Sequence, residues 1–365
     1  TLHGDCEWEE EKSVAEMVAK KIGIPFFFVD LSDIYRQRVV DYMFNEYEHG
    51  RTPNPDILCN REIKFDAFLN KAIELGADYV ATGHYCIKEE SNNMIALSEN
   101  QQNNNLNLTM NEEREEKRRG NKSYKLIAGA DKNKDQSYFL CQLSQAQLAR
   151  ALFPIGHLQK AEVRTIAKEA GLPSAEKKDS QGICFVGKVN LPLFLQQKLK
   201  PKEGNVVEIF ASDYKKIATN ENNRANYIEG ISITERLDIE KMGIITADGP
   251  QRRKLTDPYP TLPAEYGEVN IGILKKLSTP VKYSPSDGKI IGIHQGAQFY
   301  TIGQRRGLDI GGHKESLFII AIDIEENTIY VGEGHSHPGL YRKALEIDGK
   351  EIHWIRPDLQ MQPGE

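Results

Sequence analysis

The sequence has no Cys-x-x-Cys pair, no secretory signal and no apolar run approaching the roughly 20 residues that span a bilayer. Its five cysteines are an odd number and are widely spaced, which disfavours a disulfide scaffold and favours a reducing compartment. Excess basic charge is absent too: the net charge of −6 argues against indiscriminate coating of nucleic acid, but allows a local basic face that holds a folded RNA. We therefore expect a soluble protein with no membrane partner.

An initiating methionine is also missing. The chain opens Thr1-Leu2-His3, and residues 1–5 resemble the end of a strand whose beginning is absent. We expect the natural N-terminus to lie upstream, where a targeting segment would not be visible. At 365 residues the chain exceeds one ordinary domain, so two domains with insertions are expected.

Helical and strand patterns alternate over roughly the first 200 residues. The predicted helices are residues 11–22, 54–73, 144–152 and 160–170, and the predicted strands are 24–30 and 77–84. The run Ile24–Asp30 is continuously apolar, as expected for a parallel strand that helices cover on both faces. The helix near Asn54 opens with an N-cap residue, a proline and an acid. This alternation predicts an α/β fold with a doubly wound parallel sheet.

Past residue 201 the pattern changes to short alternating segments. The predicted strands are residues 206–209, 289–293, 317–323, 328–331 and 344–355. They indicate a small β-rich domain, followed by the start of a further β-structure that the sequence cuts off. The predicted domains are therefore 1–202, 203–343 and 344–365.

Two polar stretches interrupt these patterns. Residues 88–122 are rich in asparagine, glutamine and serine and end in a charge run, so we predict a disordered insertion. The charge run is expected to be solvated, although its basic end could touch RNA. Residues 211–288 carry few strand patterns, and we predict a long insertion within the second domain.

Candidate chemistry lies in four short motifs: GRTPNPDILCN at 50–60, ATGHY at 81–85, KDQSY at 134–138 and DSQGICF at 179–185. Cys59 lies near the beginning of a helix, where the helix dipole and Arg61 would favour a thiolate; alternatively it is a buried core cysteine. Cys184 follows a charged, loop-like stretch, where we expect an accessible thiol. His335 and His337 have no further ligands at suitable spacing, so no metal site is predicted.

Several of these segments resemble signatures of the tRNA-specific 2-thiouridylases and occur in that family's order: residues 50–60, 134–140, 182–185 and 303–312. The resemblance covers about residues 1–87, 123–205 and 291–355. It implies an ATP-pyrophosphatase domain of the PP-loop, adenine nucleotide hydrolase-like type, then a small β-rich central domain and the start of a C-terminal β-barrel. It also implies 2-thiolation of the wobble uridine of tRNA, with ATP and Mg²⁺ as cosubstrates.

The resemblance also implies roles for the two cysteines and their neighbours. Cys184 accepts sulfur as a persulfide, and Cys59 is the second catalytic thiol, which closes a transient disulfide with Cys184 or releases hydrosulfide. Asn54, Pro55 and Asp56 lie against the target base. The Asp56 carboxylate could exchange a proton during activation, or it could only cap the helix.

Further motif residues match nucleotide and RNA contacts of the family. Gly83 matches a glycine that lets the backbone approach ATP, and Lys134, Asp135 and Gln136 match a tRNA-contacting segment. From the residues alone, Gly83 could be only a turn glycine and Lys134 only an exposed loop lysine. Residues 303–312 contain two arginines, which suit either a tight loop near a phosphate backbone or a β-turn with solvated side chains.

One family feature does not occur in the sequence, namely the Ser-Gly-Gly-Val-Asp-Ser type loop that cradles the pyrophosphate of ATP. It belongs just upstream of Thr1, so we expect this chain alone to bind ATP poorly and to be inactive. The implied partners are tRNAs that read lysine, glutamate and glutamine codons, and a sulfur donor such as a cysteine desulfurase or a relay protein. The polar insertions indicate a eukaryotic source, which favours the mitochondrion or another organelle, with the bacterial cytoplasm as the alternative.

Two other functions remain open. An ATP pyrophosphatase that adenylates an amide or a tRNA base without sulfur would need neither cysteine. A tRNA-binding module that has lost catalysis would explain the missing ATP loop. An intact glycine-rich loop encoded upstream of Thr1 would favour the sulfurtransferase.

Overall fold

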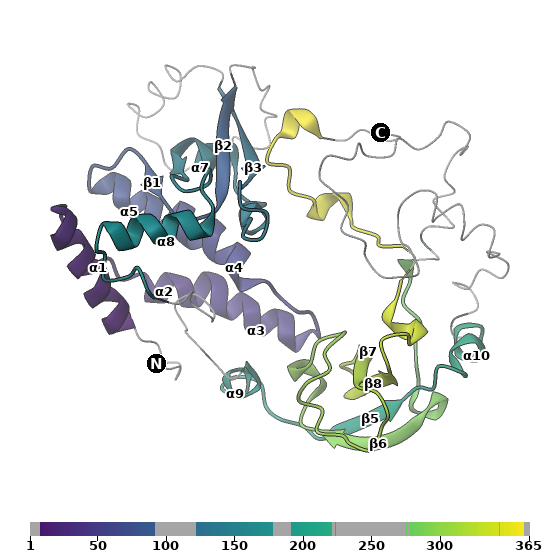
Figure 1. The fold of residues 1–365 in the computed structure, drawn as a ribbon. Helices are drawn as coiled ribbons and strands as arrows, with labels where there is room; N and C mark the ends of the chain where they lie inside the picture. Colours follow the sequence, from purple (N-terminus) through teal and green to yellow (C-terminus); the bar gives the residue numbers. More distant parts are fainter. Residues whose placement is uncertain are drawn as a thin grey trace. The chain divides into compact units, whose positions relative to one another are not determined.

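The computed structural model describes residues 8–91, 122–177, 191–220, 223, 275, 278–342 and 344–360. The chain divides into two compact units, which Figure 1 shows coloured along the sequence. Unit 1 is Thr1–Lys200 with Lys350–Glu365, and unit 2 is Pro201–Gly349. No helix among the described residues is both long enough and apolar enough to cross a membrane.

The first helix, α1 (Trp8–Ile22), confirms the predicted helix and begins three residues earlier. Acidic residues in its first turn and Lys20 and Lys21 in its last turn suit the helix dipole. The helix ends at Gly23, whose φ of +76° lies in the left-handed region that glycine adopts without strain.

The strand predicted over Ile24–Asp30 is wrong. These residues have no regular secondary structure, and the Phe27 side chain is 69% exposed. Among the described residues, no strand pairs with this segment. An apolar run becomes a buried strand only when a neighbouring strand takes up its backbone hydrogen bonds, and the sequence pattern cannot show whether that neighbour is in place.

Two long helices follow, each with π-helical turns inside it. They are α2 (Ser32–Tyr35), η1 (Arg36–Val40) and α3 (Asp41–Glu48), then α4 (Pro55–Leu58), η2 (Cys59–Ala67) and α5 (Phe68–Glu74). The second helix confirms the prediction, with Asn54 as its N-cap and Pro55 in its first turn. Its apolar stripe buries Phe65 and Leu69.

The described residues of unit 1 form two small sheets. Strand β1 (Val80–Ala81) pairs in parallel with β4 (Ala151–Leu152), which confirms the parallel α/β pairing, although the described strands are short. Strands β2 (Cys86–Ser91) and β3 (Ser123–Ala128) form an antiparallel pair. This pair corrects the insertion predicted over 88–122, because residues 88–91 belong to a strand whose first residue, Cys86, is buried; residues 92–121 lie outside the described residues.

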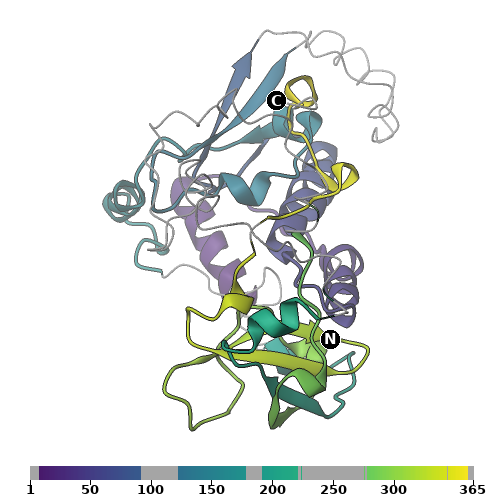
Figure 2. The same ribbon diagram turned by 90° about the vertical axis from the view of Figure 1, so that its right-hand side faces the viewer.

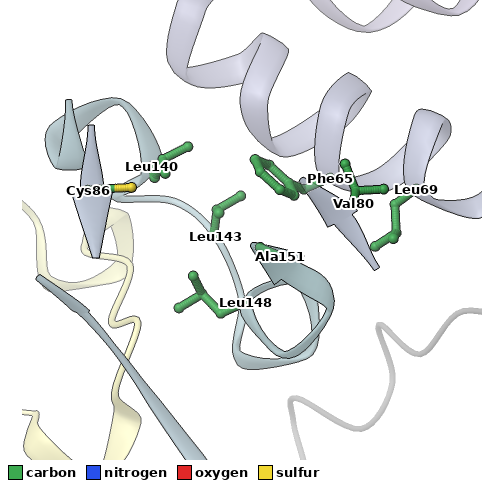
Figure 3. Packing of buried hydrophobic residues seen from close by; sticks show 8 residues of the cluster. All are labelled: Phe65, Leu69, Val80, Cys86, Leu140, Leu143, Leu148 and Ala151. Carbon is green, nitrogen blue, oxygen red and sulfur yellow. The ribbon is translucent and has the colours of Figure 1, made fainter. Parts of the chain in front are cut away.

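The core of unit 1 lies between the 55–74 helix and these strands. Figure 3 shows Phe65 and Leu69 of the helix facing residues of the strands and of the chain that follows β3. The buried cluster is Phe65, Leu69, Val80, Cys86, Leu140, Leu143, Leu148 and Ala151. The 55–74 helix and strands of both sheets contribute to this one cluster, and Tyr124 and Leu126 of β3 pack against it, so the helix and both sheets are stabilised together.

The helices described between β3 and the end of this part of unit 1 are η4 (Ser137–Leu140), α7 (Gln145–Arg150), α8 (Lys160–Glu169) and α9 (Leu191–Leu195). Ser144 caps α7 as predicted, in a reciprocal capping box with Gln147. The predicted helix was two residues too long, because Ala151 and Leu152 extend to pair with β1. Helix α8 confirms the helix predicted over residues 160–170.

The strands predicted over 344–355 are also wrong, since the described residues 344–360 contain only the short helices η8 (Gly349–Glu351) and η9 (Pro357–Leu359). The Gln145 side chain donates a hydrogen bond to the Ile355 carbonyl (2.7 Å), and Ile355 packs against the core of unit 1. Alternating apolar residues also suit an extended chain that lies across another element, which explains the error. No closed barrel occurs among the described residues.

Unit 2 contains a four-stranded sheet in the order β6-β5-β8-β7, and its strands confirm four of the predicted ones. They are β5 (Gly204–Glu208), β6 (Lys289–His294), β7 (Leu317–Asp323) and β8 (Thr328–Glu333). Successive residues alternate between two buried clusters: Val206 belongs to one and Val207 to the other. Helix α10 (Tyr214–Ala218) packs against one face through Ile217. Figure 2 shows the sheet and this helix as a ribbon from the side.

The edges of the insertion predicted over 211–288 are ordered parts of unit 2, namely α10, η5 (Pro285–Asp287) and the buried Asn223. The Asn223 side chain donates to the Ile217 carbonyl (3.0 Å) and the Lys282 carbonyl (2.9 Å), and it accepts from the Lys282 amide (2.8 Å). These bonds join the two ends of the stretch; residues 224–274 lie outside the described residues.

Candidate functional site

The predicted target-base residues lie at the beginning of the 55–74 helix. The Asn54 side chain accepts a hydrogen bond from the Ile57 amide (3.4 Å), which satisfies one of the unpaired N–H groups of the first turn. Asn54 is exposed, and Pro55 and Asp56 are half-buried in that turn. The three side chains therefore stand at an accessible helix start, where a ligand can reach them.

Cys59 lies one turn further along, and its side chain is fully buried. It is the first residue of the π-helical stretch η2, a type of turn that is frequent at functional sites. The Arg61 guanidinium does not stand beside an exposed thiolate, since it pairs with Glu62 (2.8 Å) and donates to Gln142 (2.9 Å). The alternative of a buried cysteine thus describes the geometry of Cys59, and its catalytic role stays a prediction.

Asn60, which the sequence analysis did not single out, joins this helix to the 134–140 segment. Its side chain is 2% exposed, and its Nδ2 donates to the Phe139 carbonyl (3.1 Å). The Gln147 side chain donates to the Arg61 carbonyl (2.9 Å) in the same region. A buried asparagine inside an apolar helix stripe is the sequence signal that could have found this contact, because burial of an amide requires a hydrogen-bond partner.

The predicted tRNA-contacting residues shape their own loop. The Asp135 carboxylate accepts from the Gly129 amide (2.9 Å) and from the amide and hydroxyl of Ser137. Gln136 and Tyr85 exchange two bonds: the Tyr85 amide donates to the Gln136 side chain (3.2 Å), and the Gln136 amide donates to the Tyr85 carbonyl (3.1 Å). Asp135 and Gln136 therefore position the loop, whatever RNA contact they make.

The Gly83 loop follows strand β1. Gly83 is exposed, and a Cβ atom at this position would meet only Ile155, at an ordinary contact distance of 3.9 Å. Next to it, His84 is buried and its Nδ1 lies 2.8 Å from the Thr82 hydroxyl. Burial, with a smaller effect of the nearby Lys64 charge, lowers the pKa of His84 to about 4. His84 is therefore neutral at pH 7.

The fold leaves room for a side chain at Gly83, so packing does not require a glycine there, and the nucleotide contact of Gly83 stays a prediction. Strand β1 is parallel to its neighbour and ends at this loop, the place where α/β sheets bind nucleotides. Among the described residues no three His, Cys, Asp or Glu side chains gather as metal ligands.

Hydrogen bonds bring three of the four motifs together. Asn60–Phe139 joins the 50–60 motif to the 134–140 segment, and Tyr85–Gln136 joins that segment to the 81–85 motif. The fourth motif, with Cys184, lies outside the described residues, so its distance from Cys59 and the predicted disulfide stay untested.

The glycine-rich residues 303–312 belong to unit 2, where Arg305 and residues 307–312 line a cavity of about 360 Å³ together with His313 and residues 315–317. Arg305 lines this cavity, but Asp309 and Glu315 do so too, so its charge is mixed. His337 has both ring nitrogens engaged, one with the Ile209 carbonyl (3.0 Å) and one as acceptor from the Gly339 amide (3.1 Å). His337 therefore has a structural role.

Comparison with known proteins identifies the family to which these motifs belong. Residues 1–188 match the model of the tRNA methyl transferase HUP domain, and residues 272–333 match that of the tRNA methyl transferase PRC-barrel domain. The chain is 48% identical over 365 residues to the tRNA-specific 2-thiouridylase MnmA of Flavobacterium johnsoniae, covering all of this chain and 75% of that protein. The chain belongs to the tRNA-specific 2-thiouridylase family.

Other relatives carry the same name. MnmA of Christiangramia forsetii is 47% identical over 365 residues, covering all of this chain and 75% of the relative. MnmA of Shouchella clausii is 36% identical over 360 residues, covering 99% of this chain and 69% of the relative. The two alignments at 47–48% identity run across all 365 residues, including the stretches that the motif resemblance left unmatched.

Proposed function

We propose that this protein is an ATP-dependent tRNA-uridine 2-sulfurtransferase, which replaces the carbon-2 oxygen of a wobble uridine with sulfur. The observation that carries this proposal is the 48% identity to a protein named tRNA-specific 2-thiouridylase across the whole chain. The joined motifs of unit 1 support it. The 134–140 segment is hydrogen-bonded both to the helix whose accessible start carries Asn54 and to the loop that follows Gly83.

The beginning of the 55–74 helix is the proposed position of the target base. The exposed Asn54 amide can bond the polar edge of a uracil, and the Pro55 ring offers an apolar surface. The half-buried Asp56 carboxylate is within the same turn and can hold a proton during activation of the base. Gly83 would admit ATP, which supplies an adenylyl group that turns the uracil oxygen into a good leaving group; Mg²⁺ is expected to bind with ATP.

Sulfur transfer is assigned to Cys184 and Cys59. A persulfide on Cys184 attacks carbon 2 through its terminal sulfur, and the carbon–oxygen bond to the leaving group breaks. The Cys59 thiolate then attacks the inner sulfur of Cys184, so that a Cys59–Cys184 disulfide forms and the thiolated uridine leaves. An external dithiol reductant restores both thiols. Because Cys59 is buried, this step requires a local movement that exposes its sulfur.

The partners and compartment are part of the proposal. The expected RNA substrates are tRNAs that read lysine, glutamate and glutamine codons. The expected sulfur donor is a cysteine desulfurase or a relay protein. The predicted compartment is an organelle if the source is eukaryotic, and otherwise the cytoplasm.

The test uses the full-length protein with unmodified tRNA, ATP, Mg²⁺, a reductant, cysteine and a cysteine desulfurase. Product nucleosides are separated and measured by mass spectrometry, with Cys184→Ser, Cys59→Ser and Asp56→Asn compared with wild type. Cys141→Ser is the matched control, because Cys141 is an exposed cysteine outside the proposed chemistry. We expect 2-thiouridine from wild type and Cys141→Ser, and almost none from the other cysteine variants.

Other products would change the assignment. Thiolation that survives in both Cys184→Ser and Cys59→Ser would overturn the sulfur-transfer route. An adenylated but sulfur-free base would favour a pyrophosphatase without sulfur chemistry, and binding of tRNA without any product would favour a binding module. A methylated uridine formed with S-adenosylmethionine would instead follow the name of the matched domain models.

A further inference from the structure

A second cavity, of about 490 Å³, lies in unit 1 beside the proposed target-base position. Its volume is within the range of about 300–1,000 Å³ that small-molecule sites occupy. It is lined by Arg38, Tyr42, Asn54, Ile57, Leu58, Arg61, Glu62 and Gln142. Asn54 belongs both to this lining and to the proposed base-binding motif, so the cavity adjoins that position.

The lining combines apolar side chains, amides and charged groups, of which the first two could contact a base. Ile57, Leu58 and the ring of Tyr42 are apolar, and the Tyr42 ring is flat, so a base can stack on it; Asn54 and Gln142 offer amides. Tyr42 is 41% exposed, and burial followed by the Glu46 charge raises the pKa of its phenol, so the ring is neutral at pH 7. An aromatic face accepts any base by stacking, and this contact is common in the recognition of single-stranded RNA.

Two guanidinium groups supply positive charge at the cavity. Arg38 contacts Glu62 (3.5 Å) and Asp66 through Nη1, and Arg61 uses Nε and Nη1 for Glu62 and Gln142. These bonds hold both groups in place, while Nη2 of each makes no hydrogen bond to any described residue. Glu62 and Asp66 balance the two guanidinium charges, so the free Nη2 N–H groups, rather than a net charge, are what this part of the lining offers to a phosphate oxygen.

We propose that this cavity binds the nucleotide next to the target uridine, with its base on the Tyr42 ring and its phosphate on Arg38 and Arg61. The proposal rests on the proposed function, because that function places the target base at Asn54. It makes Tyr42 and Arg38 substrate-positioning residues. A neighbour held in this cavity would fix the direction in which the RNA strand passes the helix start.

The test measures binding of an anticodon stem-loop RNA by the full-length protein. Three RNAs are used: one unmodified, one with an abasic residue immediately before the wobble uridine, and one with an abasic residue immediately after it. Dissociation constants are measured by fluorescence anisotropy for wild type, Tyr42→Ala, Tyr42→Phe and Arg38→Gln over a range of salt concentrations. Arg36→Gln is the matched control, since Arg36 lies two residues away, is exposed and only pairs with Asp33 (3.6 Å).

We expect Tyr42→Ala to weaken binding of the unmodified RNA about 10-fold or more, whereas Tyr42→Phe changes it less than about 2-fold, because the ring is retained. One abasic RNA should bind wild type more weakly but lose little further affinity with Tyr42→Ala. Arg38→Gln should reduce the slope of log affinity against log salt by about 0.7, as expected for one lost phosphate contact on a single strand. Arg36→Gln should leave that slope unchanged.

The proposal is overturned if Tyr42→Ala binds the unmodified RNA as wild type does, or if both abasic penalties are the same in wild type and Tyr42→Ala. A further outcome is that uridine monophosphate displaces the RNA while the abasic penalty stays the same in wild type and Tyr42→Ala. That result would assign the cavity to a free nucleotide and would also overturn the proposal. Thiolation is measured on the same wild-type preparation. If wild type thiolates tRNA while the coupling is absent, only this inference fails, whereas absence of thiolation counts against the proposed function.

Discussion

Truncating Phe65 should destabilise unit 1 far more than truncating Phe68, three residues later on the same helix. Phe65 is fully buried in the core cluster and packs edge-on against Phe153, with ring centroids 6.1 Å apart. Phe→Ala at such a site costs about 3–5 kcal/mol, because the lost transfer free energy is joined by the cost of a cavity. Phe68 is 39% exposed, so Phe68→Ala should cost only about 1–2 kcal/mol, with no enclosed cavity.

The two tryptophans make the measurement specific for this unit. Trp8 and Trp354 are the only tryptophans in the sequence, and both belong to unit 1. Tryptophan fluorescence during urea unfolding therefore follows unit 1 without signal from unit 2, which matters because a two-unit chain need not unfold in one step. Equal losses in the two variants, or a larger loss in Phe68→Ala, would refute the helix register and the core assignment.

Three further predictions use urea unfolding followed by tryptophan fluorescence, and the first adds a ligand-binding measurement. Gly129→Ala should destabilise unit 1 by about 1–3 kcal/mol, because its Cβ would overlap the Tyr85 carbonyl. Gly83→Ala should leave stability unchanged and should weaken ATP binding by the full-length protein, measured by calorimetry. Burial lowers the pKa of His84 from 6.5 to about 4, so the unfolded state binds the extra proton between these values; unit 1 should lose up to about 3 kcal/mol as pH falls from 6.5 to 4, and His84→Asn should flatten this dependence. Gln145→Ala should leave the Ile355 and Tyr124 carbonyls without their donor and shift the tryptophan emission of unit 1 at lower urea concentrations than in wild type.

The sequence predicted those elements whose residues carry their own local signals. Asn54-Pro55 and Ser144 with Gln147 are capping patterns, and both open helices in the structure. The strands β5 to β8 could be predicted because their apolar residues form short runs between turns, such as the turn at Asn327. Such signals act over a few residues, so they survive in a sequence read alone.

The errors concern elements that depend on distant neighbours. Ile24–Asp30 and residues 344–355 both have apolar patterns, but a strand forms only where another strand supplies hydrogen bonds. At the candidate site, Asp135 and Gln136 were identified by resemblance, yet their bonds to Gly129 and Tyr85 depend on chain segments that meet only in the folded protein. Burial of Cys59 also comes from packing, which no local motif records.

These bonds give the 129–140 segment a central position in the proposed reaction. It holds the Gly83 loop through Tyr85 and Gln136, and it holds the 55–74 helix through Phe139 and Asn60. A nucleotide at Gly83 and a base at Asn54 would therefore be positioned by one segment, whose own loop is fixed by the Asp135 carboxylate. Since reacting groups must be held in register for the adenylation step, a change inside this segment should impair the joint use of ATP and tRNA more than the binding of either one.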